Sequence, residues 1–176
     1  MRPIEELLRQ TKRQGIEKMT EWLEKSDYYT APASSRLNYH GCYEGGLAKH
    51  SMNVYTLFND KAKFFGFGLG QDEITIASLF HDLCKVGFYQ PNIVKGKISE
   101  GKPYVVEDTF PIGHGEKSVV MASRFIELTP TEMLLIRWHM GPYDPSWEMN
   151  GEKVQQACPY ITAFHCADIE ASKYLD

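Results

Sequence analysis

The chain has 176 residues, 43% of them hydrophobic, which is typical of one globular domain with its own core. Its 19 basic and 23 acidic residues give a net charge of −4, which argues against strong non-specific nucleic-acid binding. There is no run of about 18 apolar residues, no apolar signal core at the N-terminus and no CxxC pair among the four cysteines. We therefore expect a cytoplasmic protein without a membrane span or a disulfide framework.

The N-terminal part of the chain predicts two helices separated by irregular structure. Apolar residues spaced mostly three and four apart predict one amphipathic helix over residues 3–25, packed on the domain. Residues 28–43 carry Pro, Ser, Asn and Gly, which favour irregular structure. A second helix is expected from about Gly46 to about Phe65, because apolar residues again share one face.

The middle of the chain predicts a buried helix and then a small β excursion. A helix is expected over roughly 72–86, with Asp72 as a candidate cap. Residues 92–107 contain two short β-type runs around a Gly- and Lys-rich turn, which predicts a β-hairpin or flap. The lysines of this segment favour a solvated loop over a flap that closes on phosphates.

The remaining sequence predicts helices only. They are expected at about 114–127, 130–139 and 159–173. Thr129 or Thr131 is a candidate cap for the second of them, with Pro130 near its first turn. The predicted fold is therefore all-α, one domain over residues 1–176, with a small β-hairpin excursion around 92–107.

Histidines and an aspartate are distributed one per predicted element. These residues are His50, His81, His114, His139 and Asp168. Helix bundles build metal sites from side chains that point inward from facing helices. Asp82 follows His81 directly in an apolar run, where burial of two ionisable groups is unfavourable unless something compensates it. A mixed imidazole and carboxylate set suits a divalent transition metal such as Mn, Fe, Co, Ni or Zn.

Five motifs in fixed order resemble the HD-domain metal-dependent phosphohydrolase superfamily. They are GGLAKH (45–50), LFHDLCK (79–85), PIGHGEKS (111–118), IRWHMG (136–141) and FHCADIEAS (164–172). The resemblance covers about residues 39–173 and is closest to the HD domain of bacterial 3′–5′ exoribonucleases. It implies an HD-domain helical bundle.

The resemblance also implies roles for individual residues. The basic metal-binding set of the family matches His50, His81, Asp82 and Asp168. His114 and His139 match an additional pair that completes a second metal position, with Asp82 bridging two ions. Lys85 matches a lysine that meets a phosphate oxygen of the substrate, and the glycine that usually precedes it is Cys84 here. The exoribonucleases carry a separate nucleic-acid-binding domain, which we do not expect in residues 1–38, so RNA is not the expected substrate.

The expected function is therefore a metal-dependent phosphohydrolase, a phosphodiesterase or phosphatase acting on a nucleotide or short oligonucleotide. Two ions that share a water would lower the pKa of that water, which gives hydroxide near neutral pH. The same ions would bind the phosphate oxygens. With a single ion, His114 and His139 would contact the substrate instead. The alternatives are an HD-superfamily di-iron oxygenase, which uses the same ligand plan, and a non-catalytic nucleotide-binding module.

Two further histidines have less defined roles. His40 lies in the irregular segment and could either touch the substrate or serve as a surface or capping residue. His165 precedes Asp168 by three residues, and we expect it to pack against or orient that ligand.

Overall fold

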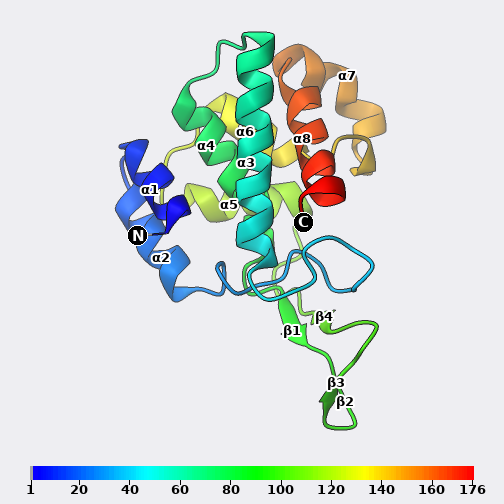
Figure 1. The fold of residues 1–176 in the computed structure, drawn as a ribbon. Coiled ribbons are helices and arrows are strands. Elements are labelled where there is room, and N and C mark those ends of the chain that lie inside the picture. Colours follow the sequence, from blue (N-terminus) through cyan, green and yellow to red (C-terminus); the bar gives the residue numbers. More distant parts are fainter. Residues whose placement is uncertain (1) are drawn as a thin grey trace.

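The computed structural model describes residues 2–176, and most of them are helical. The α-helices are α1 (Pro3–Gln10), α2 (Ile16–Lys25), α3 (Gly46–Phe65), α4 (Gln71–Phe80), α5 (His114–Ser123), α6 (Pro130–Trp138), α7 (Trp147–Ala157) and α8 (Ile161–Tyr174). Two short 3-10 helices, η1 (Leu83–Lys85) and η2 (Gly141–Tyr143), follow α4 and α6. The expected all-α architecture with a small β excursion is confirmed (Figure 1). Within residues 2–176, none of the helices combines the length and apolarity needed to span a bilayer.

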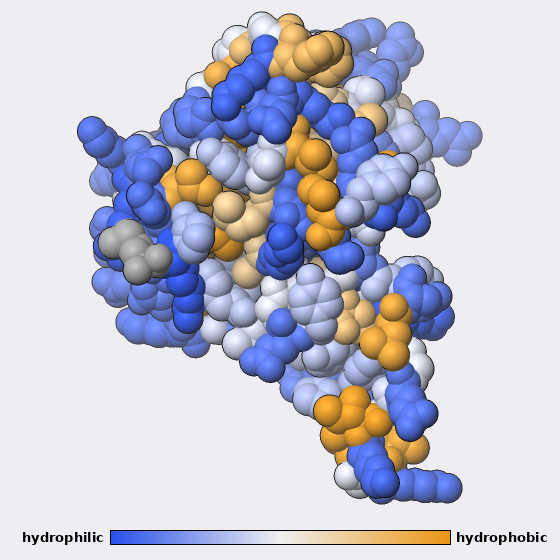
Figure 2. Space-filling model, in the orientation of Figure 1, coloured by the Kyte–Doolittle hydropathy of each residue, from blue (hydrophilic) through white to orange (hydrophobic). Residues whose placement is uncertain are grey.

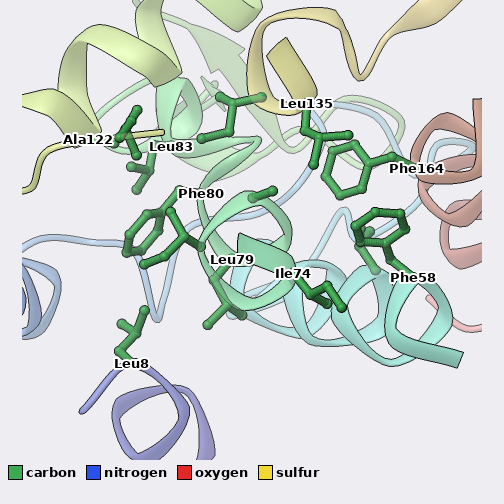
Figure 3. Close-up of a cluster of buried hydrophobic side chains, with 14 of the residues drawn as sticks. Leu8, Phe58, Ile74, Leu79, Phe80, Leu83, Ala122, Leu135 and Phe164 are labelled. Carbon is green, nitrogen blue, oxygen red and sulfur yellow. The ribbon is translucent and has the colours of Figure 1, made fainter. Parts of the chain in front are cut away.

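Helix α4 lies at the centre of the hydrophobic core. Every side chain from Ile74 to Phe80 is buried, and α1, α3 and α6 all pack against this helix. Figure 3 shows apolar side chains of other helices around it, among them Leu8 of α1, Phe58 of α3 and Leu135 of α6. Because α4 is enclosed, the residues that follow it, His81 and Asp82, also lie inside the protein.

Helix α3 is the longest helix, and it runs along the front of the bundle in Figure 1. It packs against α4 on one side and α8 on the other. The C-terminus lies beside the half of α3 that begins at Gly46 (Figure 1). This arrangement brings the first turns of α3 and the end of the chain together.

The single helix expected over residues 3–25 is wrong, because the chain turns between α1 and α2. Lys12 and Gly15 both have positive φ, 51° and 88°, which ends one helix and starts the other. In this turn Arg13 contacts the carboxylates of Glu132 at 2.8 Å and Asp72 at 2.7 Å. Asp72 therefore pairs with Arg13 instead of capping α4, whose N-cap is Gly70. Ion pairs to residues far along the chain stabilise a turn that local periodicity does not reveal.

The later helices agree with the prediction except at two places. Thr129 caps α6, accepting a hydrogen bond from the Glu132 backbone N–H at 3.2 Å, and Pro130 is its first residue. The helix predicted over 72–86 ends at Phe80, so His81 and Asp82 lie beyond its end. Helix α7 is not among the predicted helices, and Gly151 in its interior lowers the helix propensity of this segment.

Residues 89–106 form an arm that projects from the bundle (Figure 1). The expected β-hairpin is present, and it consists of two nested antiparallel pairs that begin at Tyr89, three residues before the predicted segment. Strand β1 (Tyr89–Pro91) pairs with β4 (Tyr104–Val106), and β2 (Ile93–Val94) pairs with β3 (Lys97–Ile98). The lysines of the arm are exposed, as expected of a solvated loop. Figure 2 shows that apolar side chains at its tip are also exposed.

Candidate metal centre

Six side chains with metal-binding atoms meet at one end of the bundle. They come from α3 (His50), the residues after α4 (His81 and Asp82), the first residue of α5 (His114), the residue after α6 (His139) and α8 (Asp168). The packing of α3, α5 and α6 around α4, and of α8 against α3 and α6, thus brings together the residues that the sequence placed on separate elements.

His81 and His139 are held in the same way. Each is the residue directly after a helix, with its own backbone in the αR conformation. Its Nδ1 donates to the backbone carbonyl oxygen three residues earlier. The distances are 2.8 Å from His81 to Ser78 and 2.7 Å from His139 to Ile136. Because Nδ1 donates in both rings, each Nε2 is the nitrogen that faces the interior of the cluster and could bind an ion there.

His50 presents its Nε2 to the same region. Its Nδ1 lies 2.7 Å from the Asp176 carboxylate, so that the ring donates there. Nε2 lies 3.0 Å from Oδ1 of Asp168 and 3.3 Å from Nε2 of His81. Two imidazole nitrogens and a carboxylate oxygen therefore converge, and a cation that displaced the proton of His50 Nε2 would contact all three at once. The donor set fits a divalent metal.

Asp82 lies between two pairs of histidines. Its Oδ2 is 3.4 Å from Nε2 of His81 and 3.7 Å from Nε2 of His50. Its Oδ1 is 2.7 Å from Nε2 of His114 and 3.7 Å from Nε2 of His139. One carboxylate oxygen thus faces each histidine pair, and a carboxylate in this position could contact two ions.

Both carboxylates are held in the ionised form. Burial alone would raise the pKa of Asp82, but the charges of Lys85 and His81 lower it well below its usual value. The Lys85 ammonium lies 2.7 Å from Oδ2 of Asp82. Burial alone would likewise raise the pKa of Asp168, but the hydrogen bond from His50 and the charges of His81 and His50 together lower it below its usual value. Ionised carboxylates are the form that binds metal.

The histidines differ in protonation. Burial lowers the pKa of His139 to about 3, with a further contribution from the charge of His81, so His139 is neutral. Burial also disfavours a charge on His50, but hydrogen bonds to Asp168 and Asp176 raise its pKa to about 9. A proton on His50 Nε2 therefore compensates Asp168 when no ion is bound. Metal and proton compete for that nitrogen.

The site opens to solvent on the side of His114. The His114 side chain is 35% exposed and that of Asp168 is 15% exposed, whereas His50, His81 and Asp82 are at most 2% exposed. A pocket of about 250 Å³ adjoins the opening, lined by Cys84, Phe88, Asp108, Pro111, Gly113, His114 and Lys117. A larger hollow of about 620 Å³ beside Arg13 contains none of the donor residues.

The two remaining histidines also lie near the cluster. His165 Nδ1 donates to the backbone carbonyl of His139 at 2.7 Å, so its hydrogen bond supports the residue after α6 and does not go to Asp168. The His40 ring lies 4.8 Å from the ring of His50, and its Nε2 is buried without a hydrogen-bond partner among residues 2–176. Burial lowers the pKa of His40 to about 4, so this ring is neutral.

The sequence did not predict that two residues of the site contact its candidate ligands. Asp176 holds His50, and the only sequence signal is its position eight residues, about two helical turns, after Asp168. Cys84 places its Sγ 3.2 Å from Nδ1 of His114, although the sequence indicated only a thiol near the site.

Comparison of the chain with protein-family models, curated proteins and solved structures gave no match.

Proposed function

We propose that this protein is a metal-dependent phosphohydrolase of the HD-domain superfamily, a phosphodiesterase or phosphatase acting on a nucleotide-like substrate. The ordered motifs of the sequence support the family, as does the meeting of their histidines and aspartates at one end of the bundle. The position of Asp82, with one oxygen toward each histidine pair, carries the proposal, because it favours a centre for two ions.

Different residues would bind the two metal ions and the substrate. His50, His81, Asp82 and Asp168 would hold one divalent ion, and Asp82, His114 and His139 would hold the second. Such ions polarise a phosphate ester and lower the pKa of a bound water. Lys85, whose positive charge is stabilised by Asp82, would add attraction for a phosphate oxygen. The exposed edge at His114 would admit the substrate through the adjoining pocket.

The first experiment is the metal content per chain, measured by plasma mass spectrometry on protein purified without a chelator or a His-tag. We expect about two transition-metal ions per chain, which the two histidine pairs on Asp82 support. The variant Asp82→Asn should lose most of this metal, whereas Asp60→Asn, at an exposed position of α3, should keep it. Failure of the metal-free protein to bind added Mn²⁺, Fe²⁺ or Co²⁺ would overturn the proposal.

The second experiment separates hydrolysis from oxygen chemistry. Metal-loaded protein is given p-nitrophenyl phosphate, bis(p-nitrophenyl) phosphate and a panel of nucleotides, and oxygen uptake is recorded in parallel. We expect ester hydrolysis that depends on Asp168 and Lys85 but not on Asp60, seen as p-nitrophenol from either aryl ester and, for a phosphatase, as inorganic phosphate. Oxygen uptake without hydrolysis of any phosphate ester would instead favour the di-iron oxygenase, and tight nucleotide binding without turnover would favour a binding module.

A further inference from the structure

Cys84 places a sulfur atom within the donor cluster at the open side of the site. Its side chain is buried, with the residue 3% exposed, on η1 directly after Asp82 and Leu83. Sγ lies 3.2 Å from Nδ1 and 3.6 Å from Nε2 of His114. Donor atoms of Asp82, Cys84 and His114 all lie within 4.8 Å of one another. The cysteine is therefore one member of a three-residue cluster.

The backbone holds this cluster in place. The Cys84 N–H donates to Oγ of Ser118 at 3.1 Å, and the Ser118 hydroxyl donates to the carbonyl oxygen of His114 at 3.3 Å. Ser118 thereby links η1 to the first turn of α5. The hydrogen bonds of the Ser118 hydroxyl to the two backbones therefore keep the Cys84 sulfur and the His114 imidazole close together, in addition to their own side-chain contact.

The distances suit a shared ion. In a tetrahedral site with a metal–sulfur bond of about 2.3 Å and a metal–nitrogen bond of about 2.0–2.1 Å, sulfur and nitrogen lie about 3.5 Å apart. The observed separation of Cys84 Sγ and His114 Nε2 is 3.6 Å. His114 Nε2 and Asp82 Oδ1 lie at hydrogen-bond distance, 2.7 Å, and would move apart by a fraction of an ångström as an ion enters.

We propose that Cys84 is a sulfur ligand of the metal position formed with Asp82 and His114. Binding replaces the S–H bond with a metal–sulfur bond, and the proton leaves to solvent. This inference rests on the proposed metal centre and adds its selectivity. Thiolate ligands favour Zn²⁺, Fe²⁺ or Co²⁺, whereas carboxylates and water favour Mg²⁺ and Mn²⁺. The position at His50 and His81 has only nitrogen and oxygen donors, so the two positions differ chemically.

The test is the optical spectrum of the metal-free protein titrated with Co²⁺. A cysteine–cobalt bond adds a strong sulfur-to-metal charge-transfer band in the near ultraviolet, which nitrogen and oxygen ligands do not produce. We expect this band in the wild type and in Cys166→Ser, where the same substitution is made on α8 at a cysteine outside the cluster. We expect its loss in Cys84→Ser, together with a fall of about tenfold or more in Zn²⁺ affinity.

Two results would overturn the inference while the metal centre stands. The first is wild-type protein that binds Co²⁺ without the band, and the second is a band that persists in Cys84→Ser. If neither protein binds Co²⁺, the metal centre itself fails. Should Cys84→Ser not fold, X-ray absorption of the zinc-loaded wild type decides. One sulfur neighbour per chain at about 2.3 Å is then expected, which is about half a sulfur per zinc when two ions are bound, and its absence counts against Cys84.

Discussion

The carboxylate of Asp176 lies 2.7 Å from Nδ1 of His50, across 126 residues of sequence. The same carboxylate accepts a hydrogen bond from the side-chain amide of Asn53, also at 2.7 Å, one turn further along α3. Asp176 thus fixes the tautomer and the orientation of the His50 ring. A carboxylate on the far nitrogen of a metal-binding histidine also makes the near nitrogen a stronger donor.

Replacement of Asp176 should weaken metal binding without removing a ligand. We expect Asp176→Ala to lower metal affinity by about 10–100-fold, because His50 loses its charged partner, and Asp176→Asn to lower it less. The measurement is competition for Co²⁺ or Zn²⁺ against a chromophoric chelator. Asp60→Asn removes an equal charge at an exposed position of the same helix as His50 and should change nothing. Equal affinities for wild type and Asp176→Ala would show that His50 needs no such support.

Metal should stabilise the folded protein. The unfolded chain does not hold the six donors together, so an ion present at about 100 times its dissociation constant should raise the free energy of unfolding by about 2.7 kcal/mol. Thermal melts with added metal and after chelation measure this shift. In His81→Ala the melting temperature should respond much less to metal. The prediction would be contradicted if a chelator removed the metal from the wild-type protein without lowering its melting temperature.

Helix α5 approaches α6 at a glycine. A Cβ at Gly115 would lie 2.1 Å from the carbonyl oxygen of Arg137, closer than any real contact. Gly115→Ala should therefore push α5 away from α6 and destabilise the fold by about 1–3 kcal/mol, as overpacking does. It should also separate His114 from His139 and reduce the metal bound. Gly68→Ala is the control, since a Cβ there meets no atom within 4 Å. Urea unfolding and metal content are measured for both, and an unchanged Gly115→Ala would refute the close approach.

The turn between α1 and α2 depends on Arg13. Its guanidinium contacts the Glu132 carboxylate, which is fully buried and also accepts the Thr129 backbone N–H at 2.8 Å. Arg13→Met should lower the free energy of unfolding by about 3 kcal/mol, because it leaves a buried carboxylate without its cation. Arg9→Met removes an exposed pair with Glu17 and should change stability by less than about 1 kcal/mol. Chemical denaturation of the two variants compares them directly.

The loss in Arg13→Met should depend on pH. Burial raises the pKa of Glu132 above its usual value of 4.5, although Arg13 opposes this effect. A carboxyl with a raised folded pKa destabilises the protein above the unfolded pKa, and this penalty fades as pH falls through the folded pKa. Without Arg13 the folded pKa rises further. The stability difference between wild type and variant should therefore be largest near pH 8 and smaller near pH 5, and a difference that grows on acidification would disprove this.

Local sequence determined most of the helices and the residue types of the site. The spacing of apolar residues placed α3, and Thr129 with Pro130 placed the start of α6, because a cap and its hydrogen bond lie within four residues. The motifs also identified the histidines and aspartates of the site, because residue type and order along the chain can be read from the sequence without a structure.

Tertiary structure decided what those residues contact. The break between α1 and α2 is stabilised by Arg13 through Asp72 and Glu132, 59 and 119 residues away, and periodicity alone could not show it. The contact of Asp176 with His50 likewise depends on the packing of α8 against α3, and that of Cys84 with His114 on the position of η1 against α5. Residue spacing encodes which face of a helix is apolar, but only the packing of the helices decides which polar atoms meet at their ends.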